Sequence, residues 1–122
     1  STLDNLLAGR FAGERLLIKI DVEGAEFGVL QGARDTLRRP VQPMWLLEVC
    51  LHEFHPQGFN PEFLQVFQMF WDNGYEAYTA DSQPRLVPRE RIEAWWAARR
   101  TDSGTFNYLF AAPAAMAGIT AP

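Results

Sequence analysis

The stretch Leu16–Glu26, LLIKIDVEGAE, decides the fold of this chain. It reads as a short aliphatic strand that runs into an acidic, glycine-containing turn, and a helix follows directly. In extended backbone, alternate residues from Leu17 to Asp21 share one face of the strand. In α/β proteins, ligands bind outside the carboxyl ends of parallel strands, at junctions of this kind. The stretch therefore predicts an α/β fold with a candidate site after residue 20.

A strand–helix–strand unit extends from this junction. Helical spacing of apolar residues predicts a helix over 25–37, and Pro40 and Pro43 then interrupt the chain. The next strand, Met44–Cys50, is apolar except for Glu48, as is typical of a central parallel strand covered by helices. The unit has about the ~30 residues that such a crossover needs.

Shorter signals predict the remaining elements. We expect helices over 4–11, 61–74 and 88–100, and strands over 75–79 and 105–111. Ser1 or Thr2 can cap the helix over 4–11, and Asn60 can cap the helix over 61–74. Residues 112–122 contain little besides alanine, proline and glycine. We therefore expect one domain over residues 1–112 and a flexible tail over 113–122.

Composition excludes several classes of function. The chain has 122 residues and a formal net charge of −4, so it lacks the basic footprint of a nucleic-acid-binding or anionic-membrane-binding protein. No apolar run reaches the ~18 residues of a membrane span, and no signal peptide opens the sequence. The single cysteine, Cys50, lies in an apolar run and is expected to be a buried thiol. These features favour a cytoplasmic location.

Two carboxylates carry the candidate chemistry. Asp21 and Glu48 each come at the end of an apolar strand, where a charge needs a partner or an exposed opening. Because parallel strands end side by side, both carboxylates are expected to line one pocket. Asp21 can orient a substrate hydroxyl, a cofactor or a metal there, or it can pair with Lys19. His52 follows the second strand, and a histidine with a carboxylate can remove a proton from a hydroxyl nucleophile.

Other polar residues near the junction have alternative explanations. Glu23 and Glu26 bracket the start of a helix, where the dipole alone favours carboxylates, although Glu23 can also reach a ligand. A divalent cation is a further alternative, which would make the chain a metal-dependent hydrolase. The spacing of its possible ligands matches no established metal motif. Those ligands are Asp21, Glu48, His52 and Glu53.

Several motifs occur in an order that resembles one known family. IKIDVEGAE at 18–26 is followed by VLQGA at 29–33, and weaker matches surround them at Leu3-Asp4, Leu47-Glu48-Val49, Gly74-Tyr75 and Asn107-Tyr108-Leu109. Together they resemble the second half of the FkbM family of S-adenosylmethionine-dependent methyltransferases. The family's glycine-rich cofactor loop, and the acidic residue that holds the cofactor ribose, have no counterpart in this sequence.

The resemblance implies both a fold and an activity. It implies strands four to seven of a class I, Rossmann-like methyltransferase fold, with a mostly parallel sheet and an antiparallel last strand. It implies O-methyl transfer from S-adenosylmethionine to a hydroxyl of a sugar or natural product, as part of a longer domain, with this fragment alone inactive. On that mapping Asp21 lies at the catalytic centre, Glu48 and His52 line the acceptor side, and Asp21 and Glu23 contact the cofactor.

A binding role is the main alternative to catalysis. A half-sheet without its neighbouring strands exposes an apolar edge, which can recruit another protein. The chain is then a truncated, non-catalytic module, with a homodimer through the exposed sheet edge as its simplest assembly.

Overall fold

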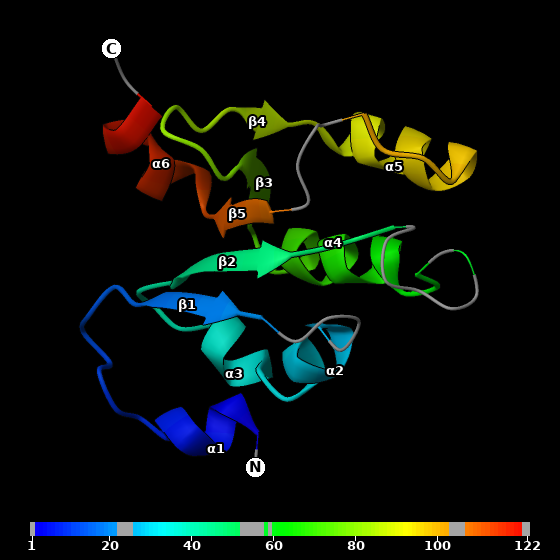
Figure 1. Cartoon of the computed structure of the whole chain (residues 1–122). Coiled ribbons are helices and arrows are strands. Elements are labelled where there is room, and N and C mark those ends of the chain that lie inside the picture. Colours follow the sequence, from blue (N-terminus) through cyan, green and yellow to red (C-terminus); the bar gives the residue numbers. More distant parts are fainter. Residues whose placement is uncertain (1, 22–25, 52–57, 59, 103–106, 121–122) are drawn as a thin grey trace.

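The computed structural model describes residues 2–21, 26–51, 58, 60–102 and 107–120, the last of these with side chains as far as residue 117. Helices and strands alternate along most of the chain (Figure 1). The elements are α1 Leu3–Leu7, β1 Leu17–Ile20, α2 Glu26–Gln31, α3 Arg34–Leu37, β2 Met44–Glu48, α4 Phe63–Asp72, β3 Glu76–Thr79, β4 Leu86–Val87, α5 Arg89–Ala98, β5 Asn107–Ala111 and α6 Pro113–Thr120.

The strands form one mixed sheet in the order β1-β2-β5-β3-β4. The α/β class is therefore confirmed, but the prediction of a mostly parallel sheet is wrong. Of the pairings among described residues, only β1–β2 is parallel, with Ile20 opposite Leu47. The physical reason is that β5 lies between β2 and β3 and runs against both, while β3 and β4 form a hairpin. The three strands β1, β2 and β3 still point in one direction.

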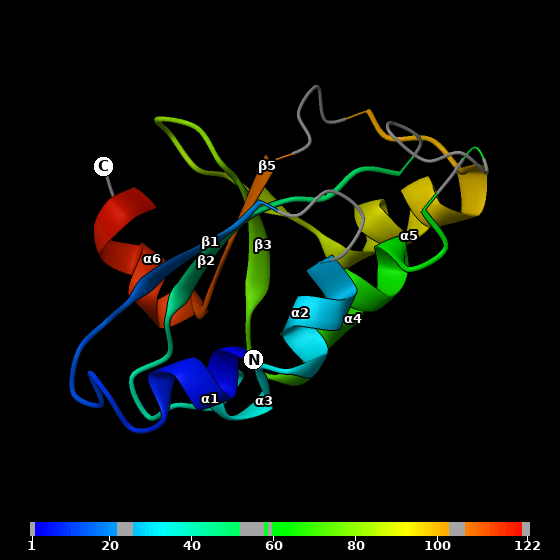
Figure 2. The ribbon, with the colours of Figure 1, turned by 60° about the horizontal axis from the view of Figure 1, so that its bottom comes forward.

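Helices cover the two faces of this sheet unequally. Figure 2 shows α2, α4 and α5 on one side and α6 on the other. The covered face carries the main core, in which the rings of Phe70 and Phe110 stack with centroids 3.9 Å apart. Trp45 of β2 meets Phe70 edge-on at 5.6 Å and is fully buried. The aromatic side chains of α4 thus pack directly onto the central strands.

The opposite face of β1 and β2 stays largely open among the described residues. Leu17 is 67% exposed, Lys19 and Asp21 are also exposed, and Leu46 is only half-buried. The predicted alternation along β1 is confirmed, because Ile20 points to the core and is 7% exposed. The expectation that helices cover both faces along the whole of β2 is not met, since the cluster around Met116 of α6 includes Met44 at the start of β2 but no later residue of that strand.

The helix predicted over 25–37 is interrupted, forming α2 and α3. At the break, the carbonyl of Gly32 accepts a 3.0 Å hydrogen bond from the backbone amide of Asp4 instead of continuing the helix. A Cβ on Gly32 would lie 3.0 Å from the Thr2 side chain. The missing side chain therefore lets the start of α1 approach, and Thr2 caps α1 by accepting a bond from the Asn5 amide at 3.1 Å.

The segment expected to be a tail contains α6 instead. Met116 is 2% exposed and packs with Tyr78 and Ala111 on the otherwise open face. The expectation of a loose tail rested on weakly packing composition, and it overlooked that one methionine can anchor an alanine-rich helix. Alanine has the highest helix propensity, which explains why this segment becomes helical once Met116 is buried.

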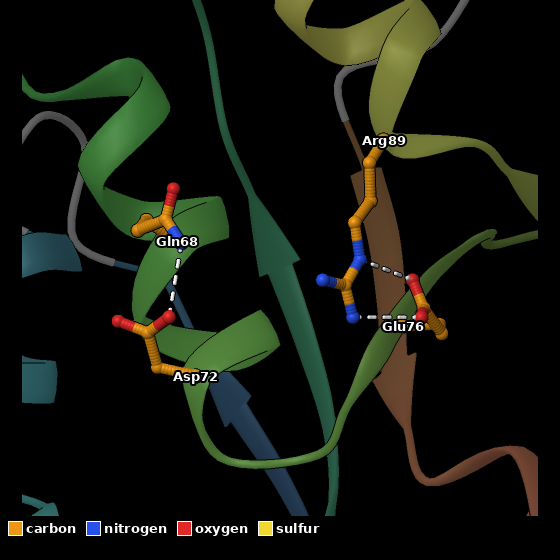
Figure 3. Close-up of polar contacts among 4 residues, drawn as sticks. All are labelled: Gln68, Asp72, Glu76 and Arg89. Atoms are coloured by element: carbon orange, nitrogen blue, oxygen red, sulfur yellow. Dashed lines mark hydrogen bonds and ion pairs between the residues drawn. The ribbon is translucent and has the colours of Figure 1, made fainter.

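Polar contacts on α4 and α5 include one that joins a helix to the sheet. Arg89, the first residue of α5, forms a two-pronged contact with Glu76 of β3 at 2.9 and 3.4 Å (Figure 3). On α4, Gln68 donates to Asp72 one turn later at 2.9 Å. The Arg89–Glu76 contact joins α5 to β3, whereas the Gln68–Asp72 bond lies within α4.

Candidate functional site

A small pocket lies where β1 and β2 end. Its volume is about 70 Å³, and it brings Asp21 and Glu48 together, as the sequence predicted. It opens on the uncovered face of the sheet, because alternate residues of β1 and β2 point there. Its lining residues are Lys19, Ile20, Asp21, Leu46, Glu48 and Asn107.

Residues that follow β2 in the chain position Glu48 and the segment directly after the strand. The Cys50 thiol donates a hydrogen bond to Glu48 Oε1 at 3.6 Å, and Cys50 itself is 6% exposed. Asn60 then holds the base of the following loop: its Nδ2 donates to the Cys50 carbonyl at 3.2 Å, and its amide donates to the Leu51 carbonyl at 2.6 Å. The predicted buried thiol is confirmed, and it has a specific polar partner.

The N-cap of α4 is Glu62 and not the predicted Asn60, which instead supports the turn before the helix. Its Oδ1 accepts from the Glu62 amide at 3.0 Å and its carbonyl accepts from Phe63, so it closes the turn that leads into α4. Because the same side chain also binds the end of β2, the start of α4 and the carboxyl end of β2 are held together.

The structure changes the interpretation of Asp21. The sequence suggested a carboxylate at the end of a buried strand, for which Lys19 was a possible partner. Asp21 is instead exposed, because β1 has one open face. The ion pairs found in the described part of the chain join Arg89 to Glu76 and Arg91 to Asp102, and none joins Lys19 to Asp21. Asp21 therefore needs no structural partner and remains accessible to a ligand.

The other predicted site residues cannot be placed. Glu23 belongs to residues 22–25, and His52 belongs to residues 52–57, both outside the described residues. The same holds for Glu53, the remaining possible metal ligand. Within the described residues no cluster of three or more histidine, cysteine or acidic side chains is arranged to hold a metal ion. Glu26 is described, and it is buried at the start of α2.

Asn107 lines the pocket, and the sequence analysis did not name it as a candidate. It is the first residue of β5 and pairs in register with Glu48. The signal was present in the Asn107-Tyr108-Leu109 motif, but its position in the sequence indicated only a last strand. The insertion of β5 beside β2 brings Asn107 to the pocket.

A larger cavity, about 250 Å³, lies between α1 and α3, among residues that precede β1 and β2 in the chain. Asp4 lines it, but its carboxylate already accepts bonds from the Thr36 hydroxyl at 2.7 Å and from the backbone amides of Asp35 and Thr36. Burial raises the pKa of Asp4, and the bonds from Thr36 and the α3 amides outweigh burial, so the pKa lies below 3.8. This carboxylate is a structural tie between two helices.

The pocket at β1 and β2 offers a distinct chemistry. Asp21 and Glu48 supply carboxylate oxygens that accept protons, Lys19 supplies an ammonium donor, and Asn107 supplies an amide that can donate and accept. Among the described lining residues, two carboxylates stand against one ammonium, a formal excess of one negative charge. Such a set suits a neutral ligand with hydroxyl groups, and it disfavours an anionic one.

The fold and site together define an α/β protein whose pocket lies beyond the carboxyl ends of parallel strands. The family model described as "Methyltransferase FkbM domain" matches residues 1–77. That range covers more than half of the chain, from α1 into β3, and includes Asp21 and Glu48. The chain belongs to the FkbM methyltransferase domain family.

No curated protein and no solved structure matches the chain. Among the helices that the structure describes, none is both long enough and apolar enough to cross a membrane. Membership of the family therefore comes from the matched range alone, and methyl transfer is the general activity that it suggests.

Proposed function

We propose that this chain forms the acceptor side of an S-adenosylmethionine-dependent O-methyltransferase, as part of a longer domain that acts on a hydroxyl of a sugar or natural product. The observation that carries the proposal is the shared pocket of Asp21 and Glu48 at the ends of β1 and β2. Membership of the FkbM family supports methyl transfer as the reaction. His52, which follows β2 in the sequence, is a third candidate residue, besides Asp21 and Glu48, for the acceptor side of the site.

The size of the pocket favours the acceptor over the cofactor. Sites that enclose a ligand of drug-like size have volumes of roughly 300–1,000 Å³. The pocket lined by described residues has about 70 Å³, so S-adenosylmethionine does not fit inside it. We therefore propose none of the described residues as part of a pocket that encloses S-adenosylmethionine. The expected contacts of Asp21 and Glu23 with the cofactor stay predictions.

The carboxylates suit the proton transfer that O-methylation requires. A hydroxyl oxygen becomes a stronger nucleophile as a base withdraws its proton. In the proposed reaction the acceptor O–H bond breaks and its proton passes to a carboxylate. The oxygen would form a bond to the methyl carbon as the bond from that carbon to sulfur breaks, and the sulfur would keep the electron pair, leaving S-adenosylhomocysteine. Glu48 is the better base, because the Cys50 thiol orients its carboxylate and it is half-buried. Exposed Asp21 then orients the acceptor from the neighbouring strand.

The sheet supports the proposal of a longer domain. The order β1-β2-β5-β3, with β5 antiparallel between its neighbours, agrees with strands four to seven of a class I, Rossmann-like fold. In addition, β1 is an edge strand, and the open face beside it carries Leu17 at 67% exposure. Further strands beside β1, with helices over that face, would bury both features.

Calorimetry with S-adenosylmethionine tests this proposal. We expect the native polypeptide that carries this chain to bind the cofactor, and the 122-residue chain alone to give no binding heat. The native polypeptide should then transfer a labelled methyl group to neutral hydroxylated acceptors. Binding by neither protein would contradict the proposal.

The open sheet edge also favours a second candidate, in which the chain is a non-catalytic, self-associating module. An edge strand with an exposed apolar side chain is a template for pairing with another chain. Here β1 is such a strand, with Leu17 exposed on its open face. A homodimer through β1 is the simplest assembly of this kind. Neither partner in such a pair needs to bind a cofactor.

A further inference from the structure

Asn107 stands apart from the other polar groups of the pocket in its chemistry. Asp21 and Glu48 only accept hydrogen bonds when ionised, and Lys19 only donates them, whereas a carboxamide does both. Asn107 comes from β5, on the opposite side of β2 from β1 (Figure 1). The pocket is thus lined by three strands, and among its described lining residues the one side-chain amide belongs to Asn107, the partner of Glu48 in register.

The pairing of strands places this amide at a defined position. Asn107 opposes Glu48 in register, and opposed residues of an antiparallel pair have Cβ atoms about 4.5–5.5 Å apart. Their side chains point to the same face of the sheet. A hydroxyl bound to Glu48 is therefore within reach of Asn107, and so is a second hydroxyl on the adjacent carbon of the same ligand.

The pocket is large enough for a pair of hydroxyl groups. A cavity needs at least about 10–15 Å³ to hold one water molecule, so about 70 Å³ has room for two neighbouring hydroxyls. One of them can give its proton to Glu48. The other can accept a bond from the Asn107 amide and donate to its carbonyl. The pocket then recognises a pair of neighbouring hydroxyls in one step.

We infer that Asn107 is a specificity-determining residue that selects a vicinal diol as the acceptor and leaves one hydroxyl of the pair at Glu48. This inference rests on the proposed function for the identity of the reaction. Its binding part stands independently, because it depends only on the shared pocket. It concerns a residue outside the range that defines the family match, since that range ends at residue 77.

Two neutral probes test the inference by NMR on the 122-residue chain: cis-1,2-cyclohexanediol and cyclohexanol, which differ by one hydroxyl. We expect the diol to bind roughly three- to tenfold more tightly, the value of one or two neutral hydrogen bonds. The diol should also shift the side-chain amide signals of Asn107. Asn107→Ala should abolish the preference, and Asn107→Asp, which keeps an acceptor but loses the amide donors, should weaken it. The matched control, Asn5→Ala on exposed α1, should leave it unchanged.

Equal affinities for the two probes, or a preference that survives in Asn107→Ala, would overturn the inference. A methylation assay on the native polypeptide separates it from the proposed function. If hydroxyl acceptors are methylated but Asn107→Ala lowers kcat/KM equally for diols and single alcohols, the function stands and the inference falls. If diol-selective binding at Asn107 is found without methyl transfer, the inference stands and the function falls.

Discussion

Glu48 at the end of β2 lies directly opposite Asn107 at the start of β5. The two residues are paired because β5 is antiparallel to β2, so the first residue of one strand lies beside the last residue of the other. A parallel strand in that place would bring its own carboxyl end there instead. The mixed sheet therefore makes the pocket a junction of β1, β2 and β5.

The carboxylates of the pocket are open to direct test. We expect Glu48→Gln and Asp21→Asn, each in the native polypeptide, to lower kcat for methyl transfer by about 10²-fold or more, because the first removes the general base and the second removes the group that orients the acceptor. Steady-state assays with labelled S-adenosylmethionine measure the effect. Glu93→Gln, on the exposed surface of α5, is the matched control and should keep full activity. Unchanged rates in both pocket variants would remove these residues from the mechanism.

Asp4 should contribute to stability through the bonds it accepts from the start of α3. Replacing a carboxylate that caps helix amides costs about 1 kcal/mol, and we expect Asp4→Ala to lower the free energy of unfolding by about that amount at pH 7. Urea titrations measure it. The surface variant Glu93→Ala should stay within about 0.5 kcal/mol of the wild type.

The contribution of Asp4 should also depend on pH. Its pKa is lower in the folded than in the unfolded state, so the ionised form is favoured by folding. The stabilisation is fully present well above pH 3.8 and disappears as the pH falls through the lowered value. The difference between wild type and Asp4→Ala should therefore shrink on acidification. A difference that grows below pH 3.8 would contradict this assignment.

Gly74 should tolerate substitution poorly. It follows α4 with φ at +87°, and its amide and that of Tyr75 bond back to Trp71 and Phe70, which is a Schellman motif. We expect Gly74→Ala to lower the free energy of unfolding by about 1 kcal/mol, because a Cβ is disfavoured at this φ. Gly28→Ala is the matched comparison. Gly28 lies inside α2 with nothing within 4 Å of an added Cβ, so the same change should stabilise the chain by about 0.5–1 kcal/mol.

The open face of β1 leads to a prediction about the homodimer. If the chain pairs through β1, Leu17→Asp should shift the 122-residue chain from dimer to monomer in sedimentation experiments, because it places a charge on the exposed apolar surface. Leu6→Asp, at 59% exposure on α1, serves as the control and should leave the dimer intact. A monomer in the wild type at all concentrations would argue against self-association.

The local elements around the site followed directly from the sequence. Alternation along Leu17–Asp21 predicted which residues of β1 share a face, and the apolar run before Glu48 identified β2. These signals are local, because side-chain direction in a strand reverses at every residue. The convergence of Asp21 and Glu48 also followed, since parallel neighbouring strands end at the same edge of a sheet.

Other features depended on contacts between distant segments. The break at Gly32 arises from the approach of Thr2 and Asp4, some 30 residues away, and α6 forms where Met116 finds Tyr78. No local pattern encodes either contact. The exposure of Asp21 likewise depends on which helices cover the sheet, and not on the apolar residues that precede it.

The sequence by itself thus determined the strand–helix–strand unit, the family, and the choice of Asp21 and Glu48 as candidate residues. Each of these follows from a local pattern of residues. Only the tertiary structure decided that the sheet is mixed and that Asn107 joins the pocket. The physical reason is strand pairing: β5 inserts beside β2 through backbone hydrogen bonds that any sequence can make. Which strands become neighbours is therefore settled by the packing of the whole domain.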